Sequence, residues 1–402
     1  MNNLSVELRR QLLDKLDSCT DVSDDQILSM IDEMVLEAGK TKDLPLAEME
    51  DLRRSLFCSV RRLDVLQDLL DDPEITEIMV NGYRHIFYEK HGKIREWDHC
   101  FESKMRLEDV IQQIAGWCNR VVNEQRPIAD ARLPDGSRVN IVMDPVAIDG
   151  PVVTIRRFPE EPIRMEDLVR LGSLTVEAAD FLKDLVEARY AILVGGGTST
   201  GKTTFLNALT AYIPESERVL TIEDNAELQI QRVRNLVRME ARSANLEDAH
   251  EITIRDLIKT ALRMRPDRLL IGEIRGAEAE DLLTSLNTGH DGGMCSLHSN
   301  NVRDSIGRIE VMVLMSNEEL PIPVIRRQIA SGVEILVHLS RDAAGARQLS
   351  EIAEITGMDG NEVQIRTLFA RDQEGVLRKK NTLTRTGKLE KLYERKGGKY
   401  QR

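Results

Sequence analysis

The chain has 402 residues, of which 41% are hydrophobic and 31% are charged, and this composition indicates a globular protein of two or three domains. Its net charge of -13 argues against a general nucleic-acid binder, which needs a basic face for the phosphates, so we expect no stable nucleic-acid partner. No apolar run approaches the roughly 18 residues of a membrane span, and the first ten residues lack the apolar centre of a signal peptide, so we expect a cytoplasmic protein.

The first seventy residues have helical periodicity. Ser23 and Gln26 fit a capping box ahead of apolar residues with helical spacing, and Gly39 predicts the end of that helix. A second helical stretch follows Pro45. We therefore predict a helical N-terminal segment over residues 1–70.

The pattern changes at Asp71, where apolar and polar residues alternate around the turn signals Asn81-Gly82 and His91-Gly92. More short strands, separated by a helix near residues 107–123, continue the pattern, and we predict an α+β domain over residues 71–160. The polar stretch that follows predicts a linker over residues 161–174. A helix that starts near Thr175 opens the next domain, which we expect to end at residue 371.

The segment after Tyr190 has the features of a phosphate-binding loop. An apolar strand, AILV, leads into GGGTSTGKTT, and FLNALTAYI follows with helical spacing. This fits GxxxxGK[ST], in which backbone N–H groups surround phosphates, the lysine reaches the β- and γ-phosphates and the hydroxyl binds Mg²⁺. The residues predicted to bind nucleotide are Gly196, Gly197, Thr198, Ser199, Thr200, Gly201, Lys202, Thr203 and Thr204. Strands and helices alternate from here on, which predicts an α/β fold with a mostly parallel sheet.

Acidic residues follow two of the later strands. Glu223, Asp224 and Glu227 come just after RVLTI, where ligands lie in open α/β sheets, although such residues can equally cap a helix or solvate a loop. In RLLIGEI, Gly272 stands where a metal-binding aspartate is expected, and Glu273 follows it. If the chain hydrolyses ATP, the metal must be held elsewhere.

Several motifs together carry a family resemblance. They are GGGTSTGKTT, TIEDNAEL, ALRMRPDRLLIGEIRG, TGHDGGMCSLHSN, the upstream DPEITEIMVNG, ARLPDGSRVNI and DGPVVTIRRF, and the later IAEITGMDG. From Asp71 to about Arg371 the chain resembles the secretion ATPases of type II and type IV secretion and type IV pilus systems, particularly the CpaF-like branch that serves Tad (Flp) pili. The resemblance implies a RecA-like P-loop core preceded by a PAS-like α+β domain that closes over nucleotide.

The resemblance also implies roles for residues of the site. Glu273 is at the position that orients or deprotonates the attacking water, and His298 is at the γ-phosphate end of the site. For Mg²⁺ we infer Thr203 as a direct ligand, with Glu223, Asp224 or Glu227 acting through coordinated water. His290 could equally be structural, and its spacing from His298 does not fit a zinc site.

The upstream module contributes four arginines, Arg132, Arg138, Arg156 and Arg157. Exposed arginines usually only make a surface soluble. In the family this domain supplies positive charge to the nucleotide, and Arg138 and Arg156 are the best candidates to approach the phosphates.

The last segment, residues 372–402, is rich in lysine and arginine. We expect a basic C-terminal tail that is either a solvated, partly disordered end or a contact with an anionic membrane surface.

These observations predict an ATP hydrolase that uses ATP and Mg²⁺ and forms a homo-oligomer, most simply a hexamer. We expect it at the inner face of the cytoplasmic membrane, on an inner-membrane platform protein, driving assembly of a Tad-like pilus or protein secretion. The alternatives are a type IV secretion ATPase for DNA or protein transfer, an ATP-dependent nucleic-acid translocase, and an ATP-binding scaffold without turnover.

Overall fold

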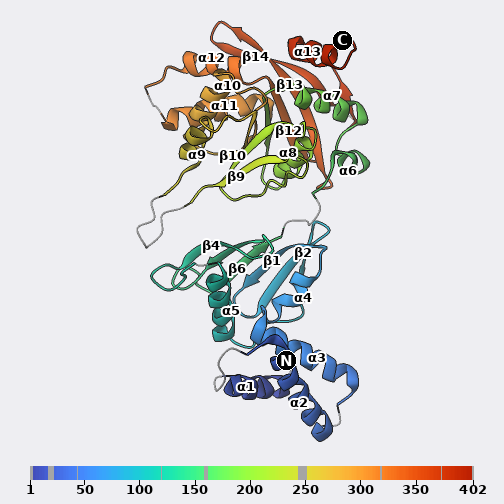
Figure 1. Cartoon of the computed structure of the whole chain (residues 1–402), viewed down its shortest axis with the longest axis vertical. Helices are drawn as coiled ribbons and strands as arrows, with labels where there is room; N and C mark the ends of the chain where they lie inside the picture. Colours follow the sequence, from blue (N-terminus) through green and yellow to red (C-terminus); the bar gives the residue numbers. More distant parts are fainter. Residues whose placement is uncertain are drawn as a thin grey trace. The chain divides into compact units, whose positions relative to one another are not determined.

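The computed structural model describes residues 3–16, 22–42, 44–118, 120–157, 162–242, 251–316, 319–372 and 374–400. The chain divides into two compact units, Met1–Glu160 and Glu161–Arg402 (Figure 1). Among the residues described, no helix is long and apolar enough to cross a membrane.

The N-terminal unit begins with a small helical cluster. Its helices are α1 (Asn3–Leu16), α2 (Asp24–Lys42) and α3 (Leu46–Arg61), and they bury a shared apolar core that includes Leu12, Ile31 and Leu56. The predicted capping box is present, with the Ser23 N–H donating to Gln26 Oε1 at 2.9 Å. The prediction that Gly39 ends the helix is wrong. Gly39 lies within α2, and a Cβ there would come 2.7 Å from the sulfur of Met49, so a side chain at this position would have to displace the end of Met49.

A sheet and two helices complete the N-terminal unit. The sheet order is β3-β2-β1-β6-β5-β4, and every neighbouring pair is antiparallel. One face of the sheet packs against α5, where alternating strand residues such as Ile78 and Val139 meet Ile111 of the helix. The elements are α4 (Leu66–Asp71), β1 (Ile75–Asn81), β2 (His85–Lys90), β3 (Lys93–Glu96), α5 (Lys104–Trp117), β4 (Ile128–Arg132), β5 (Arg138–Val142) and β6 (Val152–Arg156).

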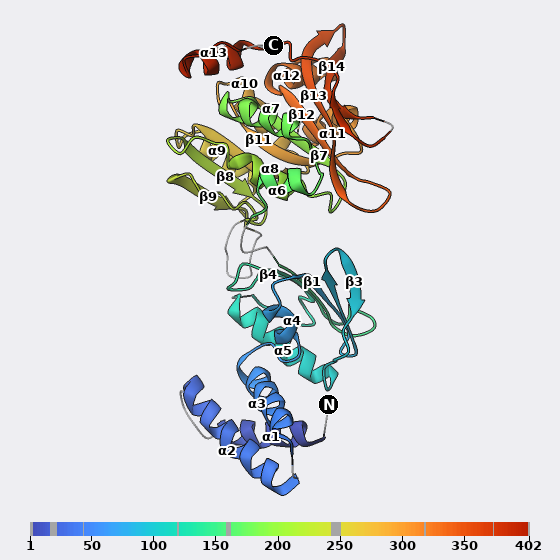
Figure 2. The ribbon, with the colours of Figure 1, turned by 90° about the vertical axis from the view of Figure 1, so that its right-hand side faces the viewer.

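The C-terminal unit is an α/β structure around a nine-stranded sheet of order β15-β14-β13-β12-β7-β11-β10-β8-β9 (Figure 2). The strands from β12 to β9 in this order pair in parallel, whereas β13, β14 and β15 are antiparallel. The sequence predicted a mostly parallel sheet and did not indicate this antiparallel extension. The strands are β7 (Ile192–Gly196), β8 (Arg218–Glu223), β9 (Asn235–Glu240), β10 (Arg268–Ile274), β11 (Met294–His298), β12 (Ile335–Arg341), β13 (Arg347–Asp359), β14 (Glu362–Arg371) and β15 (Leu377–Lys379).

Helices cover both faces of this sheet, and each face has its own apolar core. One core includes residues of α6, α7, α8 and α13, and the other includes residues of α9, α10, α11 and α12. Parallel strands covered on both sides are expected to be continuously apolar, and all five residues of β7 are buried. The helices are α6 (Met165–Arg170), α7 (Val176–Glu187), α8 (Lys202–Thr210), α9 (Ile254–Ala261), α10 (Glu278–Asn287), α11 (Val302–Ser316), α12 (Ile322–Gly332) and α13 (Gly387–Arg395).

Two predicted boundaries differ from the structure. Much of the predicted linker 161–174 belongs to the C-terminal unit, because α6 and the turn after it bury Met165 and Leu174 in its core. The predicted tail 372–402 is also largely folded onto that unit. There β15 pairs with β14, and Leu389 of α13 is completely buried. In both segments a few apolar residues among many polar ones are enough to attach the segment to the C-terminal unit.

Candidate nucleotide site

The phosphate-binding loop connects the buried strand β7 to α8. Gly201, the N-cap of α8, has a φ of 92°, and Ser199 has a φ of 57°, so the loop turns through the left-handed region twice. A Cβ on Gly195 would lie 2.3 Å from Ser299 Oγ, and one on Gly196 would lie 2.7 Å from the carbonyl of Leu339. The glycines therefore let the loop pack closely against its neighbours.

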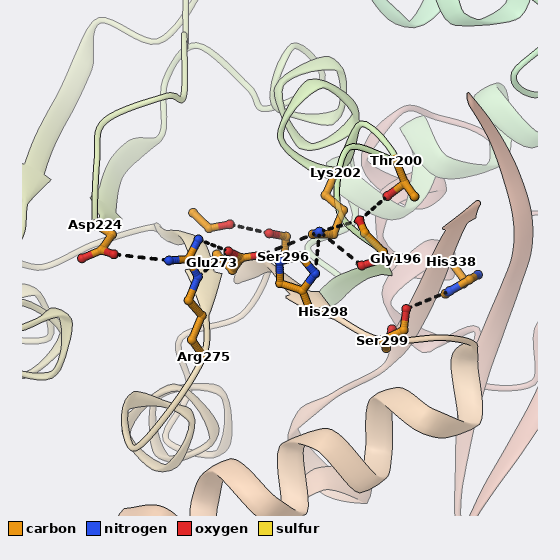
Figure 3. Close-up of polar contacts among 12 residues, drawn as sticks. Gly196, Thr200, Lys202, Asp224, Glu273, Arg275, Ser296, His298, Ser299 and His338 are labelled. Carbon is orange, nitrogen blue, oxygen red and sulfur yellow. Dashed lines mark hydrogen bonds and ion pairs between the residues drawn. The ribbon is translucent and has the colours of Figure 1, made fainter. Parts of the chain in front are cut away.

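Lys202 lies at the first position of α8, with its ammonium group under the loop. Its Nζ donates to the carbonyls of Gly196 and Gly197 at 3.2 and 3.0 Å (Figure 3). The same nitrogen lies 3.7 Å from Glu273 Oε1 and 3.4 Å from His298 Nδ1. The structure therefore brings together the lysine of the loop, the predicted catalytic glutamate and the predicted histidine.

Glu273 is the centre of this cluster. It lies near the carboxyl end of β10, and its Oε1 is 3.2 Å from His298 Nε2 at the end of the neighbouring strand β11. Its other oxygen accepts from Arg275 Nε at 2.6 Å, and Arg275 also reaches Asp224 at 3.6 Å. Burial lowers the pKa of His298, since desolvation outweighs the attraction of Glu273. The imidazole is therefore neutral at pH 7 and can accept a hydrogen bond.

Glu223 ends β8, next to β10, and is 2% exposed. Its Oε2 accepts from the backbone N–H groups of Glu227 and Leu228 at 2.7 and 2.8 Å. Its buried Oε1 has no hydrogen-bond partner. Burial raises the pKa of Glu223 to about 7, although the two backbone hydrogen bonds favour the charged form.

Gly272 accommodates this carboxylate. A Cβ at position 272 would come 3.0 Å from Cγ of Glu223, which occupies the space that a larger side chain at 272 would need. Glu223 thus stands beside the position of the missing strand aspartate. The sequence could not indicate this exchange, because it depends on the pairing of β8 with β10.

The remaining predicted nucleotide-binding residues lie along the loop and the first turn of α8. Thr200 donates its hydroxyl to the Gly197 carbonyl at 2.9 Å, Gly197 and Thr198 are exposed, and Thr203 and Thr204 are partly buried at the start of α8. Among the described residues no group of three or more histidine, cysteine, aspartate or glutamate side chains is arranged to hold a metal ion. A metal here would need water or phosphate oxygens among its ligands.

The predicted arginines lie in the N-terminal unit, on neighbouring strands of its sheet. Arg138 is the register partner of both Arg132 and Arg156, so the three side chains form a row across β4, β5 and β6. Next in the row is Glu77, opposite Arg156. Arg157 has a different role, because it donates to the backbone carbonyls of Asp72 and Ile75 within its own unit.

Residues that the sequence motifs did not indicate also support the site. Ser296 Oγ donates to the Gly272 carbonyl at 2.7 Å, and His338 Nε2 lies 3.3 Å from the Ser299 carbonyl (Figure 3). His290 lies outside this network in the turn after α10, where its Nδ1 is 3.5 Å from Thr288 Oγ1. The sequence around a serine or a histidine does not predict such contacts, because they depend on the order of the strands in the sheet.

Two further arginines contact the phosphate-binding loop from the C-terminal unit. Arg341 donates to the Ser199 carbonyl through Nε at 3.2 Å and through a terminal nitrogen at 2.9 Å. Arg347 donates to the same carbonyl through Nε at 3.1 Å. Neither arginine was predicted, because nothing local in the sequence distinguishes them from other exposed arginines.

An α/β sheet that leads into this loop, with a lysine at the helix start and a carboxylate beside it, defines a P-loop nucleotide-binding protein. Residues 61–392 match the family described as "Type II/IV secretion system protein", and the chain belongs to that family. It is therefore an ATP hydrolase of the type II/IV secretion ATPase superfamily, as the sequence motifs predicted.

Individual relatives agree with this assignment. The chain is 34% identical over 315 residues to a putative conjugal transfer protein of Mycobacterium tuberculosis, covering 77% of this chain and 88% of that protein. It is 32% identical over 322 residues to the type IV secretion system protein VirB11 of Brucella suis, covering 72% and 88%. It is also 38% identical over 261 residues to the uncharacterized protein MJ0781 of Methanocaldococcus jannaschii, covering 63% of this chain but only 36% of that protein.

A solved structure has the same fold. The crystal structure of the pilus retraction motor PilT with bound ADP aligns with a TM-score of 0.52 at 18% identity, covering 84% of this chain and 90% of that one. At this level of identity the similarity supports the α/β fold. The family match and the relatives together support an ATPase of the type II/IV secretion type.

Proposed function

We propose that this protein is a hexameric motor ATPase that couples ATP hydrolysis to assembly of a Tad/Flp-like pilus or to protein secretion. The observation that carries the proposal is the contact of Lys202, Glu273 and His298 beside the phosphate-binding loop of a secretion-family chain. The motifs of the chain from Asp71 to about Arg371 favour the CpaF-like branch. The motor would work at the cytoplasmic face of the membrane on an inner-membrane platform protein.

The chemistry follows from the charges at the site. Phosphoryl transfer needs a positioned water and neutralisation of charge on the phosphoryl oxygens. ATP would draw Lys202 from the loop carbonyls toward the β- and γ-phosphates, and Glu273 would then lose a cationic neighbour. The carboxylate is thereby available to orient the attacking water and accept its proton. The neutral imidazole of His298 can donate or accept a hydrogen bond at the γ-phosphate end.

The residues present fit a magnesium ion. Thr203 is the second residue of α8, and Glu223 has a buried oxygen without a hydrogen-bond partner. Thr203 would hold the ion directly, and Glu223, Asp224 or Glu227 would act through coordinated water. When bound, Mg²⁺ supplies charge neutralisation at the phosphate oxygens.

The proposal includes a RecA-like core within residues 175–371 and a PAS-like domain, residues 71–160, that closes over nucleotide. The row formed by Arg132, Arg138 and Arg156 supports this proposal, because its positive charge suits a polyphosphate. Of these, Arg138 and Arg156 are proposed to approach the phosphates in the closed state. Closure would convert the state of the nucleotide into domain rotation.

A second candidate is a type IV secretion ATPase for DNA or protein transfer. The similarity to VirB11 of Brucella suis and to the putative conjugal transfer protein of Mycobacterium tuberculosis favours it. The net charge of -13 disfavours an ATP-dependent nucleic-acid translocase.

Changing Lys202→Ala tests the assignment. The variant should lose nearly all ATP binding and turnover, because it removes the cation that offsets the β- and γ-phosphate charge. Steady-state ATPase assays of the full chain, with and without DNA, measure this. Wild-type turnover in the variant would refute the phosphate-loop assignment, a wild-type chain that binds ATP without turnover would favour the scaffold, and strong stimulation by DNA would favour the translocase.

A further inference from the structure

The hairpin formed by β12 and β13 brings two positive charges to the phosphate-binding loop. Arg341 ends β12 and Arg347 begins β13, and the two are register partners across the mouth of the hairpin. Like charges directly opposite one another destabilise a strand pair unless something offsets the repulsion. Here both guanidinium groups donate to one carbonyl oxygen, that of Ser199.

The sheet topology makes this contact a fixed part of the fold. β12 is the parallel neighbour of β7, with Leu339 opposite Gly196, so the end of β12 lies beside the start of the loop. The turn between the arginines is closed by Asp342, whose Oδ1 accepts the N–H groups of Ala344 and Ala346 at 2.9 and 2.8 Å. The carbonyl of Arg347 also accepts from the Ser173 hydroxyl at 2.8 Å.

The contact acts on one peptide group of the loop. In a trans peptide the C=O and the following N–H point in opposite directions, so the Thr200 N–H points away from the two arginines. The backbone N–H groups of a P-loop face the phosphates. Donation to the Ser199 carbonyl therefore fixes the orientation of the Thr200 N–H, and it polarises that group as a donor. It also restrains Ser199, whose φ of 57° is rare for a residue with a side chain.

We propose that Arg341 and Arg347 are positioning residues of the nucleotide site, which set its affinity for phosphate by holding the Ser199–Thr200 peptide. The inference rests on the assignment of this loop to nucleotide phosphate. Because the peptide would face phosphate and not the base, ADP and GDP should lose affinity by the same factor when the pair is removed. Turnover at saturation depends on Glu273 and should change little.

The test is calorimetric titration of the full chain with ADP and with GDP, combined with steady-state ATPase assays. The double variant Arg341→Met/Arg347→Met should raise the Kd for ADP roughly tenfold. It should raise the Kd for GDP, where wild-type binding is measurable, by the same factor, and leave kcat within about twofold. Each single variant should change log Kd for ADP by less than half as much as the double variant does, because the remaining arginine still holds the carbonyl. Arg378→Met is the control, since that exposed arginine of β15 pairs with Asp372.

The double variant Arg341→Lys/Arg347→Lys keeps the charge and one donor group per residue, and its Kd should be intermediate. If the methionine variant does not fold, the Kd of the lysine variant for ADP tests the proposal instead. An unchanged Kd for ADP, or a lower kcat with unchanged ADP affinity, would overturn the proposal. If instead wild type binds no ADP, or Lys202→Ala binds as well as wild type, the phosphate-loop assignment itself fails.

Discussion

Gly272 gives the site its unusual arrangement at the scale of single residues. In place of a strand aspartate, the site holds a glycine on β10 and a buried glutamate, Glu223, on the adjacent strand β8. The two backbone N–H groups that bind Glu223 Oε2 fix its position, so the carboxylate cannot move aside without breaking both bonds.

An aspartate at position 272 should therefore lower both the stability of the protein and its ATP turnover. Gly272→Asp brings a Cβ to 3.0 Å from Glu223 Cγ and adds a second carboxylate beside a buried one. We expect a loss of stability of about 1–3 kcal/mol, as for other overpacked sites, together with lower ATP turnover. Urea denaturation and an ATPase assay measure the two effects.

Gly307→Ala is the control for this substitution. Gly307 lies in α11, and nothing comes within 4 Å of a Cβ placed there, so alanine should leave stability equal or raise it by about 0.5–1 kcal/mol. Wild-type stability and turnover in Gly272→Asp would contradict the packing argument.

At the scale of secondary-structure elements, the C-terminal segment belongs to the folded ATPase unit. Lys388 donates to Glu334 at 2.7 Å and to Asp291 at 2.8 Å, and Glu354 accepts the N–H groups of Thr384 and Arg385. Basic residues that looked like a solvated tail are thus partly used for attachment to the core.

Leu389→Ala tests this attachment. Leu389 of α13 is completely buried, so the substitution should cost about 2–5 kcal/mol in the free energy of unfolding. Lys391→Ala, on the exposed side of the same helix, should change it by less than about 0.5 kcal/mol. Chemical denaturation of both variants measures the two free energies of unfolding. Equal stability of the two variants would mean that the C-terminal segment is not attached to the core.

The elements differ in how far the sequence predicts them. The phosphate-binding loop was predictable, because its glycines and Lys202 act within one short segment between a strand and a helix. The capping box of Ser23 was predictable for the same reason. The antiparallel strand β15 and helix α6 were missed, because their few apolar residues gain meaning only from distant partners.

Residues of the site also differ in whether a short sequence motif or a distant partner determines their place. Glu273 and His298 were expected from motifs, and the structure brings them within 3.2 Å of each other. The arginines Arg341 and Arg347 could not be predicted, since their contact with Ser199 requires β12 to lie beside β7.

At the scale of the whole molecule, the proposed lid and ring make a joint prediction. Arg138→Ala and Arg156→Ala should each slow ATP hydrolysis more than they weaken nucleotide binding, because they remove charge that stabilises the transition state. The activity per chain of the wild type should rise with protein concentration as subunits assemble.

ATPase assays and light scattering over a dilution series measure both effects. Arg84→Ala is a matched control in the same unit, since Arg84 lies over the Tyr83 ring. A fully active monomer, or unchanged turnover in both arginine variants, would refute this part of the account.

We propose that Glu273 acts on the attacking water while Lys202 and the loop bind the phosphates. The most direct test is the rate of ATP hydrolysis by the purified full chain carrying Glu273→Gln, with ATP binding measured on the same preparation. The amide keeps the shape of the side chain but cannot take a proton, so ATP should bind with wild-type affinity while hydrolysis falls by roughly a hundredfold or more. Near wild-type hydrolysis in Glu273→Gln, with the large loss appearing in Glu223→Gln instead, would contradict the account and exchange the roles of the two glutamates.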